Sequence, residues 1–72
     1  METATTIVIR VNGEARLVRE HATVSDLLAG LGHTGRRVAV ERNGEIVPRS
    51  RHHDTALAAD DCVEMQWFAV RK

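Results

Sequence analysis

The sequence predicts an α+β fold in which a mixed sheet of four to five strands carries one helix across one face. Three features predict it. Two Asn-Gly pairs, Asn12-Gly13 and Asn43-Gly44, each stand between strand-like runs, a helical stripe of apolar residues lies between them, and a last strand-like run starts at Cys62. Asn-Gly readily adopts the two positive φ angles of the type I′ turn that joins antiparallel strands.

The first hairpin spans residues 7–18. Residues 7–11 are rich in β-branched side chains, and residues 14–18 alternate in polarity after the Asn-Gly pair. Because successive side chains of a strand point to opposite faces, we place Ile7, Ile9 and Val11 on the face toward the core.

A helix is expected from about Val24 to Leu31. The Thr23 hydroxyl is placed to accept the N–H of Asp26, and the Asp26 carboxylate is favourable at the positive end of the helix dipole. Glycine is common at the position directly after a helix, so Gly32 is expected to end this one. Apolar residues recur at intervals of three and four and give one stripe for packing on the sheet, made of Val24, Leu27, Leu28 and Leu31.

The second hairpin joins residues 38–42 to residues 45–47. Pro48 follows it and has no backbone N–H, which suits the end of an edge strand, so this hairpin is expected at the periphery of the sheet. Residues 50–55 are polar and turn-like, and residues 56–59 are expected to form a short helical turn.

The last strand is expected over residues 62–69. Apolar and polar residues alternate here, which turns Val63, Met65 and Trp67 inward and leaves Phe68 on the opposite face. A hairpin, a helix, more strands and a last strand fit the β-grasp arrangement, with the first and last strands parallel at the centre. A small ferredoxin-like domain is the alternative, but residues 56–59 are too few for its second helix.

Length and charge restrict the function. With 72 residues the chain has room for one domain, residues 1–72, and one small core. Ten basic and ten acidic residues cancel, so nucleic acid is not an expected partner. No apolar run approaches the roughly 20 residues that cross a bilayer, and the N-terminus lacks a signal-peptide pattern. We expect a cytoplasmic protein without membrane contact.

No residue pattern indicates catalysis, a cofactor or a metal. Four histidines are present, but adjacent His52 and His53 point in opposite directions on an extended chain, and no metal-ligand spacing accompanies them. They are expected to be solvated loop residues. The lone Cys62 has no neighbouring His or basic cluster, so it is expected to be a structural or exposed thiol. Arginines at 36–37 and 49–51 are expected to be solvated loop charges.

Several longer stretches of the sequence resemble those of a known protein family. They are Val11-Asn12-Gly13-Glu14, residues 22–28, residues 37–50, Thr55-Ala56-Leu57 and residues 61–65. In this order and spacing they resemble the thiamine-biosynthesis sulfur-carrier family (ThiS), a family of ubiquitin-like β-grasp proteins, over essentially the whole chain. Asp60 stands where the family often has glycine, and Asp tolerates left-handed backbone angles better than most residues. Molybdopterin-type carriers share the fold, and residues 37–50 favour the thiamine route.

The resemblance implies a carrier and not an enzyme. In the family an E1-like adenylyltransferase (ThiF type) uses ATP to adenylate the C-terminal glycine, which becomes a thiocarboxylate and passes sulfur to the thiazole synthase (ThiG type). Glycine has no Cβ to obstruct a tail that threads a narrow channel. Here Val70, Arg71 and Lys72 align with the terminal glycines, so we expect thiocarboxylation to be hindered. The alternative is a ubiquitin-like protein-interaction module that does not conjugate.

Two residues are candidates for partner contact. Phe68 has the parity opposite to the core residues, and aromatic side chains are common anchors of interfaces. Val8 has the same outward parity in the first strand. We expect an exposed apolar patch around Val8 and Phe68, with Ala39 beside it, to be the docking surface.

Overall fold

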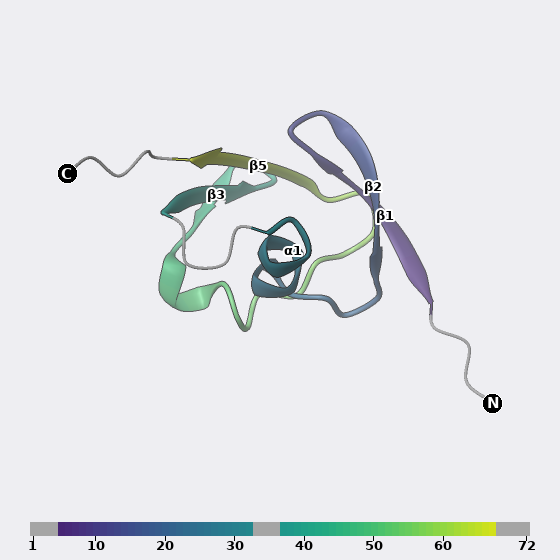
Figure 1. Ribbon diagram of the computed structural model, residues 1–72. Helices are drawn as coiled ribbons and strands as arrows, with labels where there is room; N and C mark the ends of the chain where they lie inside the picture. Colours follow the sequence, from purple (N-terminus) through teal and green to yellow (C-terminus); the bar gives the residue numbers. More distant parts are fainter. Residues whose placement is uncertain (1–4, 33–36, 68–72) are drawn as a thin grey trace.

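The computed structural model describes residues 5–32 and 37–67. Within these residues five strands form one mixed sheet in the order β2-β1-β5-β3-β4. The strands are β1 Thr6–Val11, β2 Glu14–Arg19, β3 Val38–Arg42, β4 Glu45–Val47 and β5 Cys62–Trp67. As predicted, the first and last strands lie parallel at the centre, and β5 pairs antiparallel with β3 on its other side (Figure 1).

Both Asn-Gly pairs form the predicted hairpin turns. Asn12 and Gly13 have φ angles of 51° and 87°, and Asn43 and Gly44 have 53° and 86°. The first turn joins β1 to β2, and the second joins β3 to β4. The second hairpin is peripheral as expected, since β4 is an edge strand that ends directly before Pro48.

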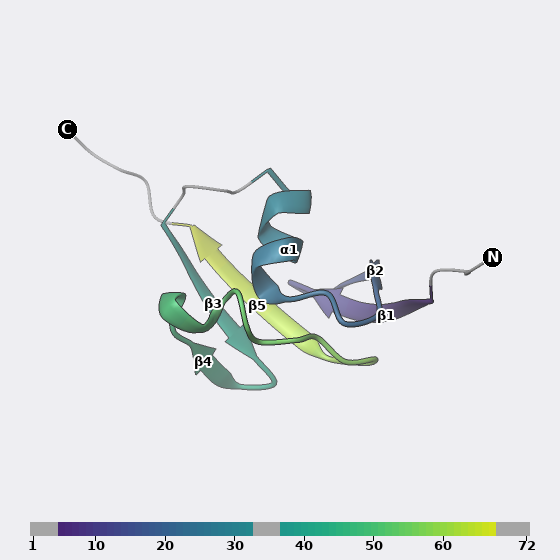
Figure 2. The ribbon, with the colours of Figure 1, turned by 90° about the horizontal axis from the view of Figure 1, so that it is seen from below.

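The helix α1, Val24–Gly30, packs across one face of the sheet (Figure 2). The predicted bond at its start is present, since the Asp26 N–H donates to the Thr23 hydroxyl at 3.2 Å. The Thr23 N–H also donates to the Asp26 carboxylate at 2.9 Å, which completes a capping box. Leu31 is the C-cap, and Gly32 follows it with a left-handed φ of 79°, as predicted for the residue that ends the helix. No helix in the described ranges is long and apolar enough to cross a membrane.

The core lies between α1 and the helix-facing side of the sheet. Ile9 is fully buried as predicted, and Ile7 and Val11 are partly buried against the same cluster. The inward parity of β5 is confirmed for Val63 and Met65. The buried hydrophobic residues are Ile9, Val24, Leu27, Leu28, Val40, Val47, Leu57, Val63 and Met65. The predicted positions of the Trp67 side chain and of Phe68 lie outside the part of the chain that is described.

The short helical turn predicted at residues 56–59 is wrong. The helical turn of this region is instead a 3-10 helix, η1 Arg49–Arg51, which follows Pro48 at φ −60°. Residues 55–57 are extended because their backbone pairs with the segment that enters α1. Leu57 N–H donates to the Ala22 carbonyl at 2.7 Å, and Val24 N–H donates to the Thr55 carbonyl at 3.0 Å. This pairing buries the Leu57 side chain in the core.

Candidate functional site

The strand β5 carries the chain through the centre of the sheet toward its C-terminal residues (Figure 1). On one side it pairs with β3 from Val38↔Trp67 to Arg42↔Val63. On the other side the ladder with β1 covers only Arg10↔Cys62 and Val11↔Val63, because β1 ends at the first hairpin turn. The start of β5 is therefore held from both sides by backbone pairing.

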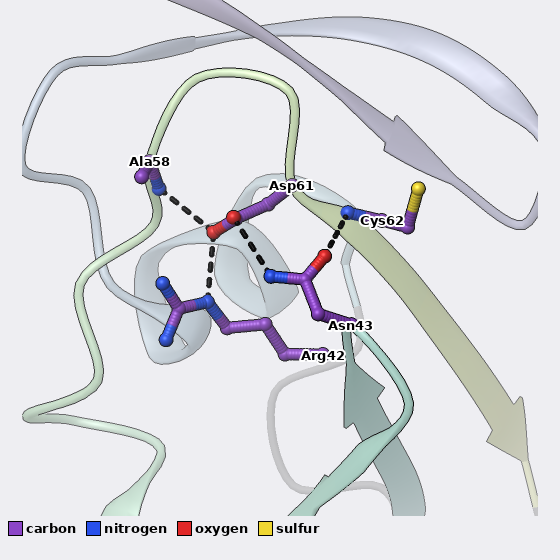
Figure 3. Close-up of polar contacts among 5 residues, drawn as sticks. All are labelled: Arg42, Asn43, Ala58, Asp61 and Cys62. Atoms are coloured by element: carbon purple, nitrogen blue, oxygen red, sulfur yellow. Dashed lines mark hydrogen bonds and ion pairs between the residues drawn. The ribbon is translucent and has the colours of Figure 1, made fainter.

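A buried carboxylate fixes the residue directly before β5. Asp61 is 6% exposed. Its carboxylate accepts hydrogen bonds from the Arg42 Nε at 2.7 Å, from the Asn43 side-chain amide at 3.0 Å and from the Ala58 N–H at 2.8 Å (Figure 3). These donors come from the end of β3, the second hairpin turn and the loop before β5. The Asp61 carboxylate therefore ties three segments together where β5 begins.

The hydrogen bonds to the Asp61 carboxylate, together with the charge of Arg42, lower its pKa by more than burial raises it. Burial alone raises the pKa of a carboxyl because it disfavours the charged form. The hydrogen bonds from Ala58, Asn43 and Arg42, together with the charge of Arg42, act in the opposite direction and leave the pKa of Asp61 below its ordinary value. Asp61 is therefore an ionised, fully engaged structural carboxylate and is not placed to exchange protons with a substrate.

Two asparagine side chains hold β5 in addition to forming the turns. The Asn43 side-chain oxygen accepts the Cys62 N–H at 2.9 Å, and the Asn12 side-chain oxygen accepts the Met65 N–H at 2.8 Å. The second bond lies where β1 has already turned away, so a side chain replaces the missing strand partner. Sequence reasoning used both asparagines only for their φ angles and missed this role. It also missed Asp61, although a carboxylate next to a core strand is itself an unusual pattern.

Of the two predicted contact residues, Val8 is the one within the described ranges, and it lies on the sheet face away from α1. Val8 is 46% exposed and lies opposite Leu17, which is 67% exposed, across the first hairpin. Ala39 is also exposed on this outer face. The exposure expected of Val8 is confirmed, whereas its contact role stays a prediction. Phe68 and the tail residues Val70, Arg71 and Lys72 lie outside the described residues.

The centre of the outer face is acidic. Glu41 of β3 and Glu64 of β5 stand directly opposite each other, and both are exposed. Like charges in this position repel each other across a sheet. Among the described residues neither takes part in an ion pair.

One prediction for the histidines is wrong. His52 is 7% exposed, and its Nε2 lies 3.1 Å from the Val47 carbonyl oxygen, so it is a buried hydrogen-bonding residue and not a solvated one. Its own carbonyl accepts the Ser25 N–H at 2.9 Å, so the residue after η1 lies against the start of α1. His21 and His53 are exposed as expected, and His33 lies outside the described residues. No group of His, Cys, Asp or Glu in the described ranges is arranged to hold a metal ion.

The remaining candidates are exposed side chains. Cys62 is an exposed free thiol. Arg37, Arg49 and Arg51 are exposed, as predicted for solvated loop charges, and the Arg51 Nε lies 3.0 Å from the Asp54 carboxylate. The described residues thus offer a firmly anchored central strand and an exposed outer face, without a nucleophile next to a base.

The profile of the ThiS family matches residues 8–65, from the first strand to the last. The chain belongs to the ThiS family. The Bacillus subtilis protein named sulfur carrier protein ThiS is 33% identical over 61 residues, covering 83% of this chain and 92% of the relative. A crystal structure of the thiamine biosynthesis protein ThiS from Geobacter metallireducens superposes with a TM-score of 0.77 at 30% identity. It covers 92% of this chain and all of that one.

Longer relatives contain a similar segment. A thiazole synthase of Paramagnetospirillum magneticum is 45% identical over 58 residues, which are 81% of this chain and 18% of that protein. A thiazole synthase of Magnetococcus marinus is 38% identical over 60 residues, also 18% of its length. This chain therefore spans less than a fifth of the length of these two relatives. The similarity to the ThiS crystal structure confirms the expected ubiquitin-like β-grasp fold.

Proposed function

We propose that this chain is a sulfur-carrier protein of thiamine biosynthesis that serves the formation of the thiazole ring. The observation that carries the proposal is the family match over residues 8–65, which includes the anchored central strand. The chain acts as a carrier and not as an enzyme. The adenylation draws on ATP, so the proposed site of action is the cytoplasm.

In this proposal the partner enzymes catalyse the chemical steps. A ThiF-type adenylyltransferase joins the C-terminal carboxylate to the α-phosphate of ATP and releases pyrophosphate. A sulfur nucleophile then displaces AMP and leaves a thiocarboxylate. The proposed acceptor is a thiazole synthase of the ThiG type, which is supported by the two thiazole synthases that contain a segment similar to this chain.

The structure supplies a rigid base for this transfer. The bonds of Asp61, Asn43 and Asn12 hold β5 from its start to Met65, which supports its role as a fixed base for the transfer. Holding a reacting group in a defined position lowers the entropic cost of the reaction. The proposed docking surface is the outer face, with the apolar pair Val8 and Leu17 on one side and the acidic pair of β3 and β5 at its centre.

The experiment uses the purified chain, a ThiF-type adenylyltransferase, ATP and a sulfur donor, and reads the intact mass. Exchange of oxygen for sulfur at the C-terminus raises the mass. We expect a variant with Arg71→Gly and Lys72→Gly to gain sulfur at least about tenfold faster than the unchanged chain, because glycine relieves the steric obstruction.

A control reaction without ATP has to leave both masses unchanged. Sulfur gain by the unchanged chain at the same rate would show that this tail is accepted as it stands. Absence of sulfur gain in both chains, with an authentic carrier loaded in parallel, would contradict the proposal. The alternative of a non-conjugating interaction module would then stand.

A further inference from the structure

The two hairpin turns carry the same tripeptide, Asn-Gly-Glu, at residues 12–14 and 43–45. Asparagine is among the residues that heat degrades. The backbone nitrogen of the following residue can attack its side-chain amide carbon, and glycine has no Cβ to obstruct this approach. Neither turn is crowded, since a Cβ added at Gly13 or Gly44 would meet no atom within 4 Å. Both turns therefore present the same reactive pair in similar local surroundings.

The reaction of such a pair needs only water, and both asparagines are exposed. The glycine nitrogen forms a bond to the asparagine Cγ and loses its proton, and the side-chain nitrogen leaves as ammonia. Water then opens the resulting succinimide at either carbonyl and gives aspartate or isoaspartate. The net change converts an amide and water into a carboxylate and ammonium, without an oxidant or a reductant. In isoaspartate the main chain is one atom longer.

The two asparagine side chains differ in how the rest of the fold holds them. The Asn43 oxygen accepts the Cys62 N–H at 2.9 Å, and the Asn43 side-chain nitrogen donates to the Asp61 carboxylate at 3.0 Å (Figure 3). The Asn12 oxygen accepts the Met65 N–H at 2.8 Å. Among the described residues the Asn12 side-chain nitrogen donates to no acceptor. Asn43 is therefore held at both ends of its amide and Asn12 at one.

This difference determines how easily each amide carbon reaches the glycine nitrogen. Both bonds of Asn43 have to break before its side chain can turn toward Gly44. One of them goes to an ionised carboxylate, and hydrogen bonds to charged groups are stronger than those between neutral groups. The nitrogen that Asp61 holds is also the one that leaves as ammonia. Asn12 has to break one bond between neutral groups.

We propose that Asn12 is a site of spontaneous deamidation in the folded protein, and that Asn43 is protected from the same reaction by its bond to Asp61. The isoaspartate formed at residue 12 lengthens the main chain of the turn and carries its carboxylate directly on Cα. The oxygen that holds the Met65 N–H is thereby displaced. Deamidation thus loosens β5 where β1 no longer supports it, whether or not the chain carries sulfur.

The rates at the two sites can be measured in one sample. The full chain is incubated in mildly alkaline buffer at physiological temperature and digested with trypsin, which cuts after arginine and releases residues 11–16 and 43–49 as separate peptides. Mass spectrometry follows the replacement of NH2 by OH in each peptide, and a digest at zero time measures reaction during handling. We expect Asn12 to react at least about tenfold faster than Asn43. Equal rates, or a faster Asn43, would overturn the proposal.

The same incubation in guanidinium chloride removes the fold and keeps both tripeptides. We expect the two rates to become similar, because glycine and glutamate follow asparagine at both sites. A difference as large as in the folded chain would come from the preceding residues, Val11 and Arg42. That result would refute protection by tertiary contacts.

A variant tests the role of the carboxylate. Asp61→Ala removes the acceptor of the Asn43 amide, so we expect Asn43 to react at least about fivefold faster. Asn12 in the same molecule reports on the fold and should stay slower than in guanidinium chloride. Asp54→Ala is the matched control: it removes an exposed carboxylate bonded to Arg51 and should leave both rates unchanged. An unchanged rate at Asn43 in Asp61→Ala would contradict the protection.

Hydrogen exchange tests the consequence for β5. Protein with isoaspartate at residue 12 has one more negative charge and is separated from the unreacted chain by ion exchange. We expect its Met65 N–H to exchange at least about fivefold faster, because the acceptor is displaced. The Cys62 N–H, which Asn43 holds, is the internal control and should keep its rate. Unchanged exchange at Met65 would overturn the proposed loosening of β5.

Discussion

The side-chain oxygen of Asn12 accepts the N–H of Met65 at 2.8 Å, a contact between residues 53 positions apart. β1 ends at Val11, so no strand continues beside this part of β5 on that side. The Asn12 amide takes the place of the missing strand partner. The residue that forms the first hairpin turn therefore also holds the central strand that leads to the C-terminal residues.

Replacing Asn12 separates these two tasks. Asn12→Gly keeps the positive φ of the turn but leaves the Met65 N–H without its acceptor, so we expect the free energy of unfolding to fall by about 1 kcal/mol. Asn12→Asp keeps an acceptor oxygen and should lie closer to the unchanged protein. Urea denaturation followed by circular dichroism measures both, and equal stability of Asn12→Gly and the unchanged chain would contradict the bond's importance.

Replacing the Asp61 carboxylate should lower the free energy of unfolding far more than replacing that of its exposed neighbour Asp60. Asp61→Asn replaces a buried acceptor of three hydrogen bonds with a group that presents its own N–H donors to Arg42 or Asn43. We expect a loss of about 2–3 kcal/mol in the free energy of unfolding. Asp60→Asn is the matched control and should change stability by less than about 0.5 kcal/mol. Similar losses in both variants would refute the assignment.

Stability should fall in acid because the pKa of Asp61 is lower in the folded protein than in the unfolded chain. The unfolded state then binds the proton more readily. The contribution is fully present above the unfolded value of about 3.9 and is lost as the pH falls below it through the folded pKa. Urea titrations at a series of pH values measure this loss. The part due to Asp61 should be missing in Asp61→Asn, and an unchanged slope in that variant would exclude Asp61 as its source.

Asp60 gives a test of backbone strain. Its φ is 69°, a left-handed angle that glycine adopts without the steric cost of a Cβ. Asp60→Gly should therefore be neutral or more stable by up to about 1 kcal/mol, whereas Asp60→Val should be less stable by about 1 kcal/mol or more. Thermal unfolding ranks the two variants. A valine variant as stable as the glycine variant would show that this angle carries no strain.

The outer face should matter for association and not for folding. Val8→Thr removes part of an apolar surface that is already 46% exposed, so the free energy of unfolding should change by less than about 0.5 kcal/mol. We expect its affinity for a ThiG-type thiazole synthase to drop about threefold or more by calorimetry. Ala58→Thr, which changes an exposed residue in the loop before β5, is the control. Unchanged affinity in Val8→Thr would remove Val8 from the docking surface.

The sequence by itself determined the local elements and their order. Asn-Gly at residues 12–13 and 43–44 predicts both hairpins, because few other pairs adopt two positive φ angles. Thr23 and Asp26 predict the start of α1, and the apolar stripe predicts its buried side. The parity of Ile9, Val63 and Met65 predicts which strand faces meet the helix. These features depend on neighbours within one turn or one strand, which the sequence displays directly.

Only the tertiary structure decided which polar groups are buried and bonded. Apart from the Ala58 N–H that Asp61 also accepts, the side-chain partners of Asp61, Asn43 and Asn12 are 18 to 53 residues away, and no local pattern fixes such a pairing. His52 is buried, and Leu57 enters the core from an extended segment, because η1 and the segment before α1 come together in space. Residues 56–59 are too few to hold a helix on their own, so their conformation follows the long-range backbone bonds that they make.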